Sequence, residues 1–186
     1  MGRMKLHPTP LAGLYEVHTE PVGDARGRFT RLFCEQELAP IRSGLHFTQI
    51  NLSETHGRGT LRGMHYQTPP AAEAKMIRCL HGRVYDVAVD LRAGSRTFLH
   101  WHALELGADN DRAVFIPEGF AHGFQALSDE VHLLYMHTAP WTPACEAGLR
   151  HDDPRLAIEW PLPVTAVSDR DRDHALIDDT FVGVHA

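Results

Sequence analysis

Hydrophobic and polar residues alternate along short segments of the chain, and turn-forming residues separate these segments. The clearest alternation runs through residues 83–92. One face of this segment carries Tyr85, Val87, Val89 and Leu91, and the other carries Val84, Asp86, Ala88 and Asp90. Successive side chains of a β-strand point to opposite faces of its sheet, so a period of two predicts a strand here.

The same features predict further short strands. These segments are 98–106, 113–116 and 130–137, and turns are predicted at 93–95, 107–110 and 128–129. Several short strands at this spacing indicate an all-β sandwich or barrel. Helix is scarce, and 35–42 is the best short candidate even though it contains Pro40.

No internal repeat or low-complexity linker divides the chain. A length of 186 residues suffices for one domain with a hydrophobic core, so we expect a single domain over 1–186. Residues 160–186 are polar and rich in aspartate. We expect them to form a mostly irregular C-terminal tail with one or two short helical turns.

Composition narrows the class of protein. No run of 18 apolar residues is present, and residues 1–10 lack the apolar centre of a signal peptide, so neither a membrane span nor secretion is expected. Three scattered cysteines are too few for a zinc pattern or a disulfide framework, which favours a reduced, cytoplasmic location. The net charge of −6 argues against nucleic acid as a partner.

An anionic small ligand remains compatible with that charge, because basic side chains can still gather locally. Six basic residues are candidates to converge on one pocket: Arg26, Arg28, Arg31, Arg58, Arg62 and Lys75. Of the 18 basic residues only Lys5 and Lys75 are lysines. A chain so biased to arginine that keeps lysine at position 75 suggests a need there for a compact ammonium.

Two motifs resemble the two halves of a cupin barrel. The first contains Gly59, the string His65-Tyr66-Gln67, Lys75 and Gly82, and the second is the string from Pro117 to His122. A metal-binding cupin has a second histidine at position 67 and a glutamate where Lys75 stands. Because a charged lysine only donates hydrogen bonds, the resemblance implies proton chemistry with no metal and no cofactor.

A second possible metal motif is weaker. Gly94 is followed after five residues by His100-Trp101-His102, and residues two apart share a strand face. Glu105 comes one residue too early for this motif, and no glycine follows at the required distance. A solvated or interface strand face is therefore favoured over a metal site.

Longer strings resemble the dTDP-4-dehydrorhamnose 3,5-epimerase family. They are Asp24–Phe29, Gln49–Ser53, Thr60–Gln67, Ile116–Phe124 and Trp160-Pro161, and together they place roughly residues 10–175 in the family's order. The resemblance implies a cupin jelly roll with a few short helices and an isomerase that epimerises C3, C5 or both of a nucleotide-linked 4-keto-6-deoxyhexose. It also implies deoxysugar biosynthesis and a homodimer that exchanges its N-terminal strands.

Epimerisation beside a ketone needs a base, a group that stabilises the enolate and an acid on the opposite face. An imidazole titrates near neutrality, so His65 suits the base, and Lys75 suits the enolate as a cation. Tyr135 suits the acid, although its strand face, shared with Val131 and Leu133, is also typical of a core residue. The resemblance gives the same three roles. It adds Asp171 as the carboxylate that orients His65, although a surface charge is the default for this position.

The resemblance also implies contacts with the nucleotide sugar. The residues at family ligand positions are Arg26, Phe29, Gln49, Asn51, Arg62, His122, Trp141, Glu146 and Arg170. Arg26 and Arg62 would hold phosphates, which suits arginine's planar fork, and the alternative for both is a surface salt bridge. Trp141 could stack on the nucleobase.

Several residues depart from the family pattern. Ile50 and Leu52 replace an aspartate and a histidine, Arg31 replaces a glutamate, and His137 replaces a cysteine. These departures leave open the nucleotide base, whether dTDP, CDP or GDP, and whether C3, C5 or both carbons react. The alternatives are a mono-epimerase, a metal-dependent cupin isomerase or oxygenase using His65 and His122, and a catalytically silent protein that binds sugar nucleotides.

Overall fold

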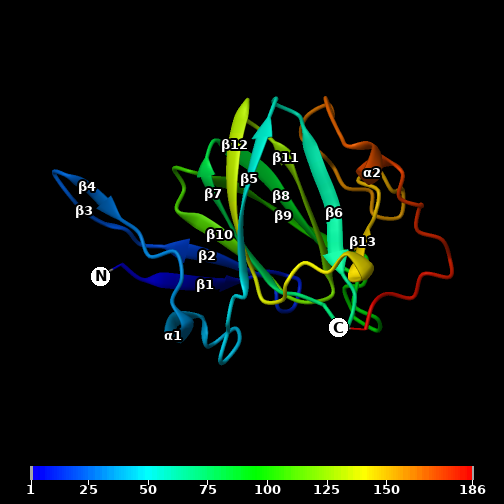
Figure 1. Ribbon diagram of the computed structural model, residues 1–186, viewed down its shortest axis with the longest axis horizontal. Helices are drawn as coiled ribbons and strands as arrows, with labels where there is room; N and C mark the ends of the chain where they lie inside the picture. Colours follow the sequence, from blue (N-terminus) through cyan, green and yellow to red (C-terminus); the bar gives the residue numbers. More distant parts are fainter. Residues whose placement is uncertain (1, 186) are drawn as a thin grey trace.

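Two antiparallel sheets face each other in the computed structural model, which describes residues 2–185 (Figure 1). The six-stranded sheet has the order β1 (Met4–Pro8), β2 (Tyr15–Thr19), β10 (Arg112–Ile116), β7 (Lys75–His81), β12 (Glu130–His137) and β5 (Gln49–His56). The five-stranded sheet has the order β13 (Glu146–Gly148), β6 (Leu61–Gln67), β11 (Phe120–Ala126), β8 (Arg83–Asp90) and β9 (Trp101–Gly107). The predicted all-β jelly roll is confirmed.

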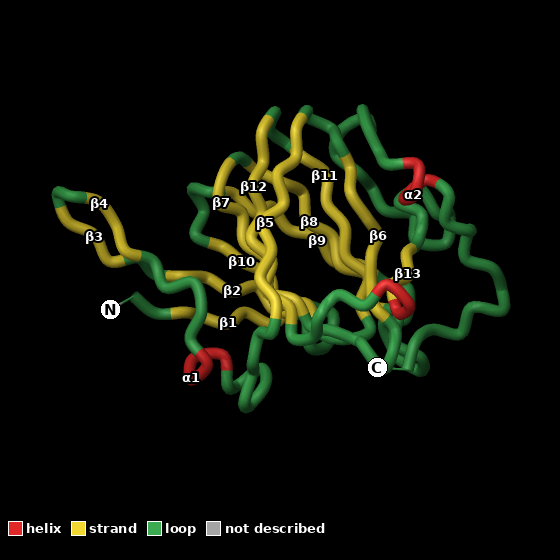
Figure 2. The backbone as a smooth tube through the Cα atoms, in the orientation of Figure 1, coloured by secondary structure: helices red, strands yellow, loops and turns green. Residues whose placement is uncertain are grey.

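Little helix accompanies the strands (Figure 2). The helical segments are α1 (Glu35–Leu38), the 3₁₀ turn η1 (Pro143–Cys145) and α2 (Asp169–Arg172). A separate hairpin, β3 (Val22–Asp24) and β4 (Gly27–Phe29), extends away from the two sheets. No helix within residues 2–185 is long and apolar enough to cross a membrane.

The predicted alternation in β8 divides its side chains between two hydrophobic clusters. Val84 and Ala88 lie in the core between the sheets, with Ile77, Leu133 and Phe124. Val87 and Val89 belong to a second cluster on the outer face of the five-stranded sheet. Burial of apolar surface contributes about 25 cal/mol per Å², so both faces of this strand stabilise the fold.

The C-terminal tail covers that outer face. Its path over 160–186 is mostly irregular, as expected, but it is well packed, because Ile177 is buried in the second cluster and Phe181 and Val184 pack against that cluster. The Asp153 carboxylate accepts hydrogen bonds from the backbone N–H groups of Arg155 and Ile177. These hydrogen bonds and apolar contacts hold the tail against the five-stranded sheet.

Three predicted boundaries were too generous. The strand predicted over 83–92 ends at Asp90. The helix predicted over 35–42 ends at Leu38 and continues as turns, because Pro40 cannot extend a helix. The strand predicted from residue 98 begins at Trp101. Before it the chain turns, because the buried Asp90 carboxylate accepts hydrogen bonds from the hydroxyls of Ser95 and Thr97 at 2.6 and 2.7 Å.

A bulge between β6 and β11 arranges the side chains of β6. The pairing of the two strands shifts register between His122 and Phe124. The backbones of Gly63 and Gly123 meet there, and a Cβ on Gly63 would lie 2.5 Å from Gly123 Cα. Residues three apart face opposite ways in a regular strand, whereas Arg62 and His65 here line the same cavity.

Candidate active site

A cavity of about 260 Å³ opens between the two sheets. The six-stranded sheet and the chain just before β7 supply one wall: Asn51, Ser53, Glu73, Lys75, Tyr135 and His137. The five-stranded sheet and the loop before β13 supply the other: Arg62, His65, Tyr66, Gln67, His122, Phe124, Trp141 and Glu146. Three of the four predicted catalytic residues, His65, Lys75 and Tyr135, thus lie in one cavity.

The fourth, Asp171, lies behind His65 and contacts it. His65 Nε2 is 2.7 Å from Asp171 Oδ1, and the backbone N–H of Gly63 donates to Asp171 Oδ2 at 3.0 Å. A carboxylate only accepts hydrogen bonds, so Nε2 carries the proton shared with Asp171. The lone pair of the neutral imidazole is then on Nδ1, which is free to act as a base.

Asp171 is buried, although its sequence neighbours are exposed. Ser168 caps α2 by accepting the backbone N–H of Asp171 at 3.1 Å, which turns the short helix toward β6. Burial by itself would raise the pKa of the Asp171 carboxyl. The hydrogen bonds from His65 and Gly63 outweigh burial and hold this pKa at about 2.

Lys75 begins β7 and its side chain is almost fully buried. Its ammonium is 3.1 Å from Glu73 Oε1 and donates to the backbone oxygen of His65 at 3.5 Å. Because this second contact is to the His65 backbone on the facing sheet, Lys75 reaches across from β7 to β6.

Tyr135 lies on the wall opposite His65, on β12. Its ring stacks on His137 and meets the edge of His122, with centroid distances of 5.8 Å in both pairs. Burial, and to a lesser extent the Asp86 carboxylate, raises the pKa of the Tyr135 phenol. The phenol therefore keeps its proton at neutral pH, as a general acid must.

His122, whose ring contacts Tyr135, forms a second histidine–aspartate pair. His122 Nε2 is 2.9 Å from Asp86 Oδ2, and both side chains are buried. The other oxygen, Asp86 Oδ1, has no hydrogen-bond partner among residues 2–185.

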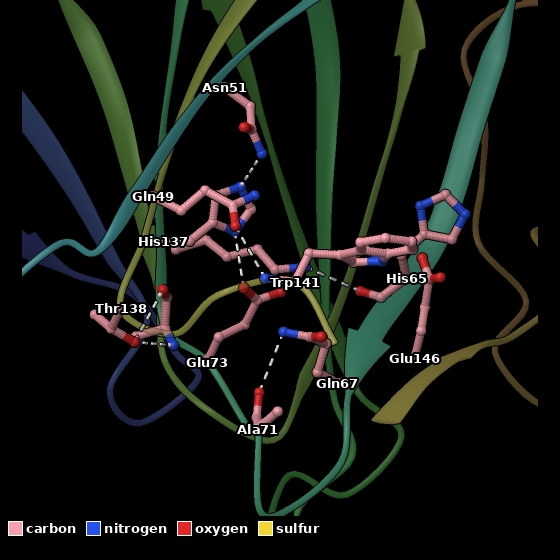
Figure 3. Close-up of polar contacts among 12 residues, drawn as sticks. Gln49, Asn51, His65, Gln67, Ala71, Glu73, His137, Thr138, Trp141 and Glu146 are labelled. Carbon is pink, nitrogen blue, oxygen red and sulfur yellow. Dashed lines mark hydrogen bonds and ion pairs between the residues drawn. The ribbon is translucent and has the colours of Figure 1, made fainter. Parts of the chain in front are cut away.

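Gln67 and Gln49 hold the loop that closes the cavity (Figure 3). Gln67 Nε2 donates to the carbonyls of Ala71 and Pro140, and Gln67 Oε1 accepts the N–H of Thr142 at 2.7 Å. Gln49 Oε1 accepts the N–H of Trp141 at 3.0 Å. Gln67, which stands at a cupin metal-ligand position, thus uses its side chain for hydrogen bonds with backbone groups.

The rim carries further predicted ligand residues. Glu146, on β13, pairs with Arg170 of α2. Arg62 donates to Thr55 Oγ1 at 2.9 Å and to the backbone oxygen of Glu54, which holds its guanidinium at the cavity wall. The Trp141 indole is 57% exposed, so its face remains open to a ligand.

Within residues 2–185, no group of three His, Cys, Asp or Glu side chains comes together as a metal ion would require. His100 and His102 do not gather such a set. His100 is exposed, and His102 lies 3.8 Å from Glu16.

The expected convergence of six basic residues is wrong for this chain taken alone. Of the six, Arg62 and Lys75 line the cavity. Arg28 pairs with Asp111 and Arg31 pairs with Glu37, and neither lines the cavity. Arg58 lies in the turn between β5 and β6 and is likewise absent from the cavity lining.

Arg26 and Phe29 also lie outside the cavity. Both belong to the extended β3–β4 hairpin (Figure 1). Arg26 pairs with Asp24, and Phe29 is 68% exposed. Gln49 and Arg170 are also absent from the cavity lining, but each contacts a lining residue, Trp141 and Glu146 respectively.

Sequence reasoning did not single out Glu73 and His137 as site residues, although both line the cavity. The sequence offered one usable signal, since His137 stands where the family pattern has a cysteine. Glu73 lies in an irregular segment, so no periodic pattern indicated which way it points.

Comparison with known proteins finds similar sequences among the dTDP-4-dehydrorhamnose epimerases. The family model described as dTDP-4-dehydrorhamnose 3,5-epimerase matches residues 8–179. A dTDP-4-dehydrorhamnose 3-epimerase of Streptomyces niveus is 39% identical over 175 residues, covering 94% of this chain and 84% of that protein. A dTDP-4-dehydrorhamnose 3,5-epimerase of Pseudomonas aeruginosa is 42% identical over 152 residues, covering 81% and 83%.

A solved structure is similar over the whole chain. It is the dTDP-6-deoxy-D-glucose-3,5-epimerase of Legionella pneumophila in complex with dTDP-4-keto-L-rhamnose. Its TM-score is 0.91 at 35% identity, and the match covers 99% of this chain and 100% of that one.

The contact between His65 and Asp171 predicts a pH-dependent contribution to stability. The folded-state pKa of Asp171, about 2, lies below the ordinary value of about 3.9. The contribution is therefore present above about pH 4 and disappears as the pH falls toward 2. Asp171→Asn should lower the free energy of unfolding at pH 7 by roughly 1–2 kcal/mol, and the difference from wild type should close near pH 2.

Urea denaturation of both proteins across this pH range measures the effect. Asp169→Asn, an exposed position in the same helical turn, is the matched control and should change stability little at any pH. An Asp171→Asn difference that does not vary with pH would contradict an ionised, hydrogen-bonded Asp171.

Proposed function

The chain belongs to the dTDP-4-dehydrorhamnose 3,5-epimerase family, and on that premise we propose how its cavity carries out the reaction. The protein is an isomerase of deoxysugar biosynthesis. It epimerises a nucleotide-linked 4-keto-6-deoxyhexose at C3, C5 or both through an enolate. The observation that carries our mechanism is that His65 and Tyr135 lie on facing sheets of one cavity.

Proton removal is assigned to His65. Nδ1 takes the proton from the carbon beside the C4 ketone, and the C–H electron pair becomes a C=C bond as the ketone oxygen gains negative charge. Asp171 stabilises the imidazolium that forms, since it already accepts a hydrogen bond from Nε2. Lys75 stabilises the enolate oxygen as a nearby cation.

Proton return is assigned to Tyr135. Its O–H proton passes to the carbon from the side opposite His65, which inverts the configuration. The phenolate and the imidazolium then exchange protons with solvent, so the enzyme returns to its starting state. The phenol suits this role because it is protonated at neutral pH and lies on the wall opposite His65, although burial, which raises its pKa, also makes it a weaker acid.

The rim residues are proposed to bind the nucleotide. Arg62 and Arg170 supply guanidinium groups for the diphosphate, and the exposed Trp141 indole supplies a stacking surface for the base. Gln49, Asn51, His122 and Glu146 complete the polar contacts. We propose dTDP as the carrier, because the similar Legionella enzyme binds dTDP-4-keto-L-rhamnose.

Epimerisation at C3 alone is a second candidate, because the Streptomyces niveus relative is named a 3-epimerase. A mono-epimerase and a 3,5-epimerase share the same chemistry at the first carbon. They differ in whether deuterium from the solvent enters one position or two.

We propose that the protein acts as a homodimer in the cytoplasm. The β3–β4 hairpin carries Arg26 and Phe29 at family ligand positions but extends away from its own cavity. A hairpin that reaches the cavity of a second copy would complete both sites with the same symmetric contact. The net charge of −6 supports a small-molecule substrate rather than nucleic acid.

Tyr135→Phe should uncouple exchange from inversion. In D2O the wild type should place deuterium at each carbon that it inverts. The variant keeps His65 and Lys75, so the proton can still leave and the enolate can still form. Without the acid on the far face, deuterium should enter with retained configuration at the carbon that Tyr135 serves, which we take to be C5.

Position-resolved NMR of the products, with a thermal melt, checks this outcome. If Tyr135 is only a packing residue, exchange and inversion will fall together with the melting temperature. Normal inversion at both carbons would refute the assignment.

Exchange of the hairpin predicts rescue between two inactive variants. One variant carries Arg26→Ala with Phe29→Ala, and the other carries His65→Ala. In an exchanged dimer of the two, one cavity has His65 and receives a native hairpin. An equal mixture that re-forms dimers at random should recover about a quarter of wild-type activity.

The control mixture combines His65→Ala with Lys75→Ala, in which every cavity lacks a catalytic side chain. It should stay inactive. If the first mixture also stays inactive although mixed dimers form, the hairpin does not serve a second copy.

A further inference from the structure

Lys75 shares its wall of the cavity with a buried carboxylate. Glu73 precedes it by two residues, and the two side chains are only 7% and 9% exposed. Glu73 Oε1 lies 3.1 Å from the Lys75 ammonium. A carboxylate and an ammonium buried in this way are almost always paired, because each ion alone would lose its hydration without compensation.

The second oxygen of Glu73 is held as well. Glu73 Oε2 is 2.8 Å from His137 Nδ1, so this nitrogen donates to the carboxylate. The other ring nitrogen, His137 Nε2, is 3.4 Å from the Asn51 amide nitrogen. Figure 3 shows His137 between Asn51 and Glu73.

The backbone around Glu73 is fixed to the neighbouring strand. Thr138, which follows β12, accepts the N–H of Ala74 on its hydroxyl at 2.8 Å, and its own N–H donates to the oxygen of Ala74 at 3.0 Å (Figure 3). The carboxylate is therefore built into the wall of the cavity.

Electrostatics keep the Glu73 carboxylate ionised. Burial alone would raise its pKa, but the hydrogen bond from His137 and the charge of Lys75 outweigh burial and leave the pKa below its ordinary value. Burial also disfavours a charged lysine, and an enolate-stabilising lysine must be charged. Glu73 supplies the negative charge that favours the ammonium form.

The geometry also gives the ammonium a direction. Of its three N–H bonds, one can point to Glu73 and one to the backbone oxygen of His65. These two contacts come from opposite walls of the cavity, and they leave the third N–H for a substrate oxygen.

We propose that Glu73, held by His137, is a positioning residue that keeps Lys75 charged and aims one N–H at the ketone oxygen of the substrate. The inference rests on the proposed function, because it assigns a partner to the enolate-stabilising lysine. The opposite expectation is that the Glu73 carboxylate only neutralises the charge that Lys75 offers to the enolate. Removal of Glu73 would then speed the reaction.

Other titratable groups surround the ammonium in the same cavity. They are His137 and Tyr135 from β12, His65 and Tyr66 from β6, His122 from β11, Arg62 from β6 and Glu146 from β13. Among residues 2–185, Glu73 is the acidic side chain that forms an ion pair with Lys75. Replacing Glu73 should therefore affect the titration of Lys75 more than replacing Glu146.

NMR of lysine labelled with ¹³C at Cε tests the proposal directly, because the chain has only Lys5 and Lys75. Lys5 is exposed and serves as an internal control, and Lys5→Arg assigns the two signals. In Glu73→Gln the Lys75 signal should titrate at least about one pH unit lower than in wild type. The Lys5 signal should not move.

Deuterium exchange into a dTDP-linked 4-keto-6-deoxyhexose is the second measurement. Glu73→Gln should lower kcat at least about tenfold with a smaller change in KM, and the basic limb of its pH profile should move to lower pH. Glu73→Asp retains the anion, so Lys75 should titrate closer to wild type than in Glu73→Gln. Glu146→Gln, the matched loss of a cavity carboxylate, should alter KM without moving the basic limb.

The outcomes separate the inference from the proposed function. A wild type that exchanges no deuterium in any nucleotide-linked keto-sugar overturns the function, while the NMR titration still tests the ion pair. An active wild type with an unchanged Lys75 titration in Glu73→Gln overturns the inference, as does a variant that is faster than wild type. If Glu73→Gln does not fold in a thermal melt, Glu73→Asp decides through kcat. The shorter side chain keeps the charge but cannot hold the ammonium in the same place, so kcat should fall, and an unchanged kcat contradicts positioning.

Discussion

The hydrogen bond between His65 and Asp171 joins two residues that are 106 positions apart in the chain. It needs three separate features of the fold. The bulge at Gly63 and Gly123 turns His65 into the cavity together with Arg62. The capped turn of α2 presents Asp171, and the packed C-terminal tail carries α2 to the back of β6. Loss of any one of them would leave a buried carboxylate without its partner, which is strongly unfavourable.

The two sheets divide the chemistry between them. The five-stranded sheet carries His65, the proposed base, whose partner Asp171 comes from α2. The six-stranded sheet carries Lys75 and Tyr135, the proposed enolate-stabilising cation and acid. In the proposed mechanism, a sugar ring held between the sheets meets a proton acceptor on one side and a proton donor on the other. Gln67, at a position where metal-binding cupins have a ligand, instead fixes the loop that bears Trp141. A position that binds a metal in other cupins thus supports a loop of this cavity.

The sequence predicted those parts that depend on local pattern. The strand 130–137 matches β12, and the two faces of β8 separate into two clusters as the alternation required. Motif spacing led to His65 and Lys75, and the family resemblance added Tyr135; the three residues share one cavity. Asp171 came from resemblance, because its acidic neighbourhood is typical of solvent-exposed chain and its burial depends on long-range packing.

Other features could not be read from the sequence for physical reasons. Arg26 and Phe29 belong to an exposed hairpin, and the proposed exchange between two copies would be needed to bring them to a cavity. Glu73 lies in a segment without periodicity, and only its distances to Lys75 and His137 reveal its surroundings. The end of helix α1 is different, because it could have been predicted: Pro40 cannot continue a helix, and α1 ends at Leu38.

The central claim is that His65 removes the proton from the sugar while the nucleotide is held elsewhere in the cavity. Its most direct test measures solvent deuterium entry into dTDP-4-keto-6-deoxyglucose by wild type and His65→Ala, together with calorimetric binding of dTDP to both. The account predicts that the variant loses about 10²–10⁴ in exchange rate while its affinity for dTDP is retained. Exchange by His65→Ala at the wild-type rate would contradict it.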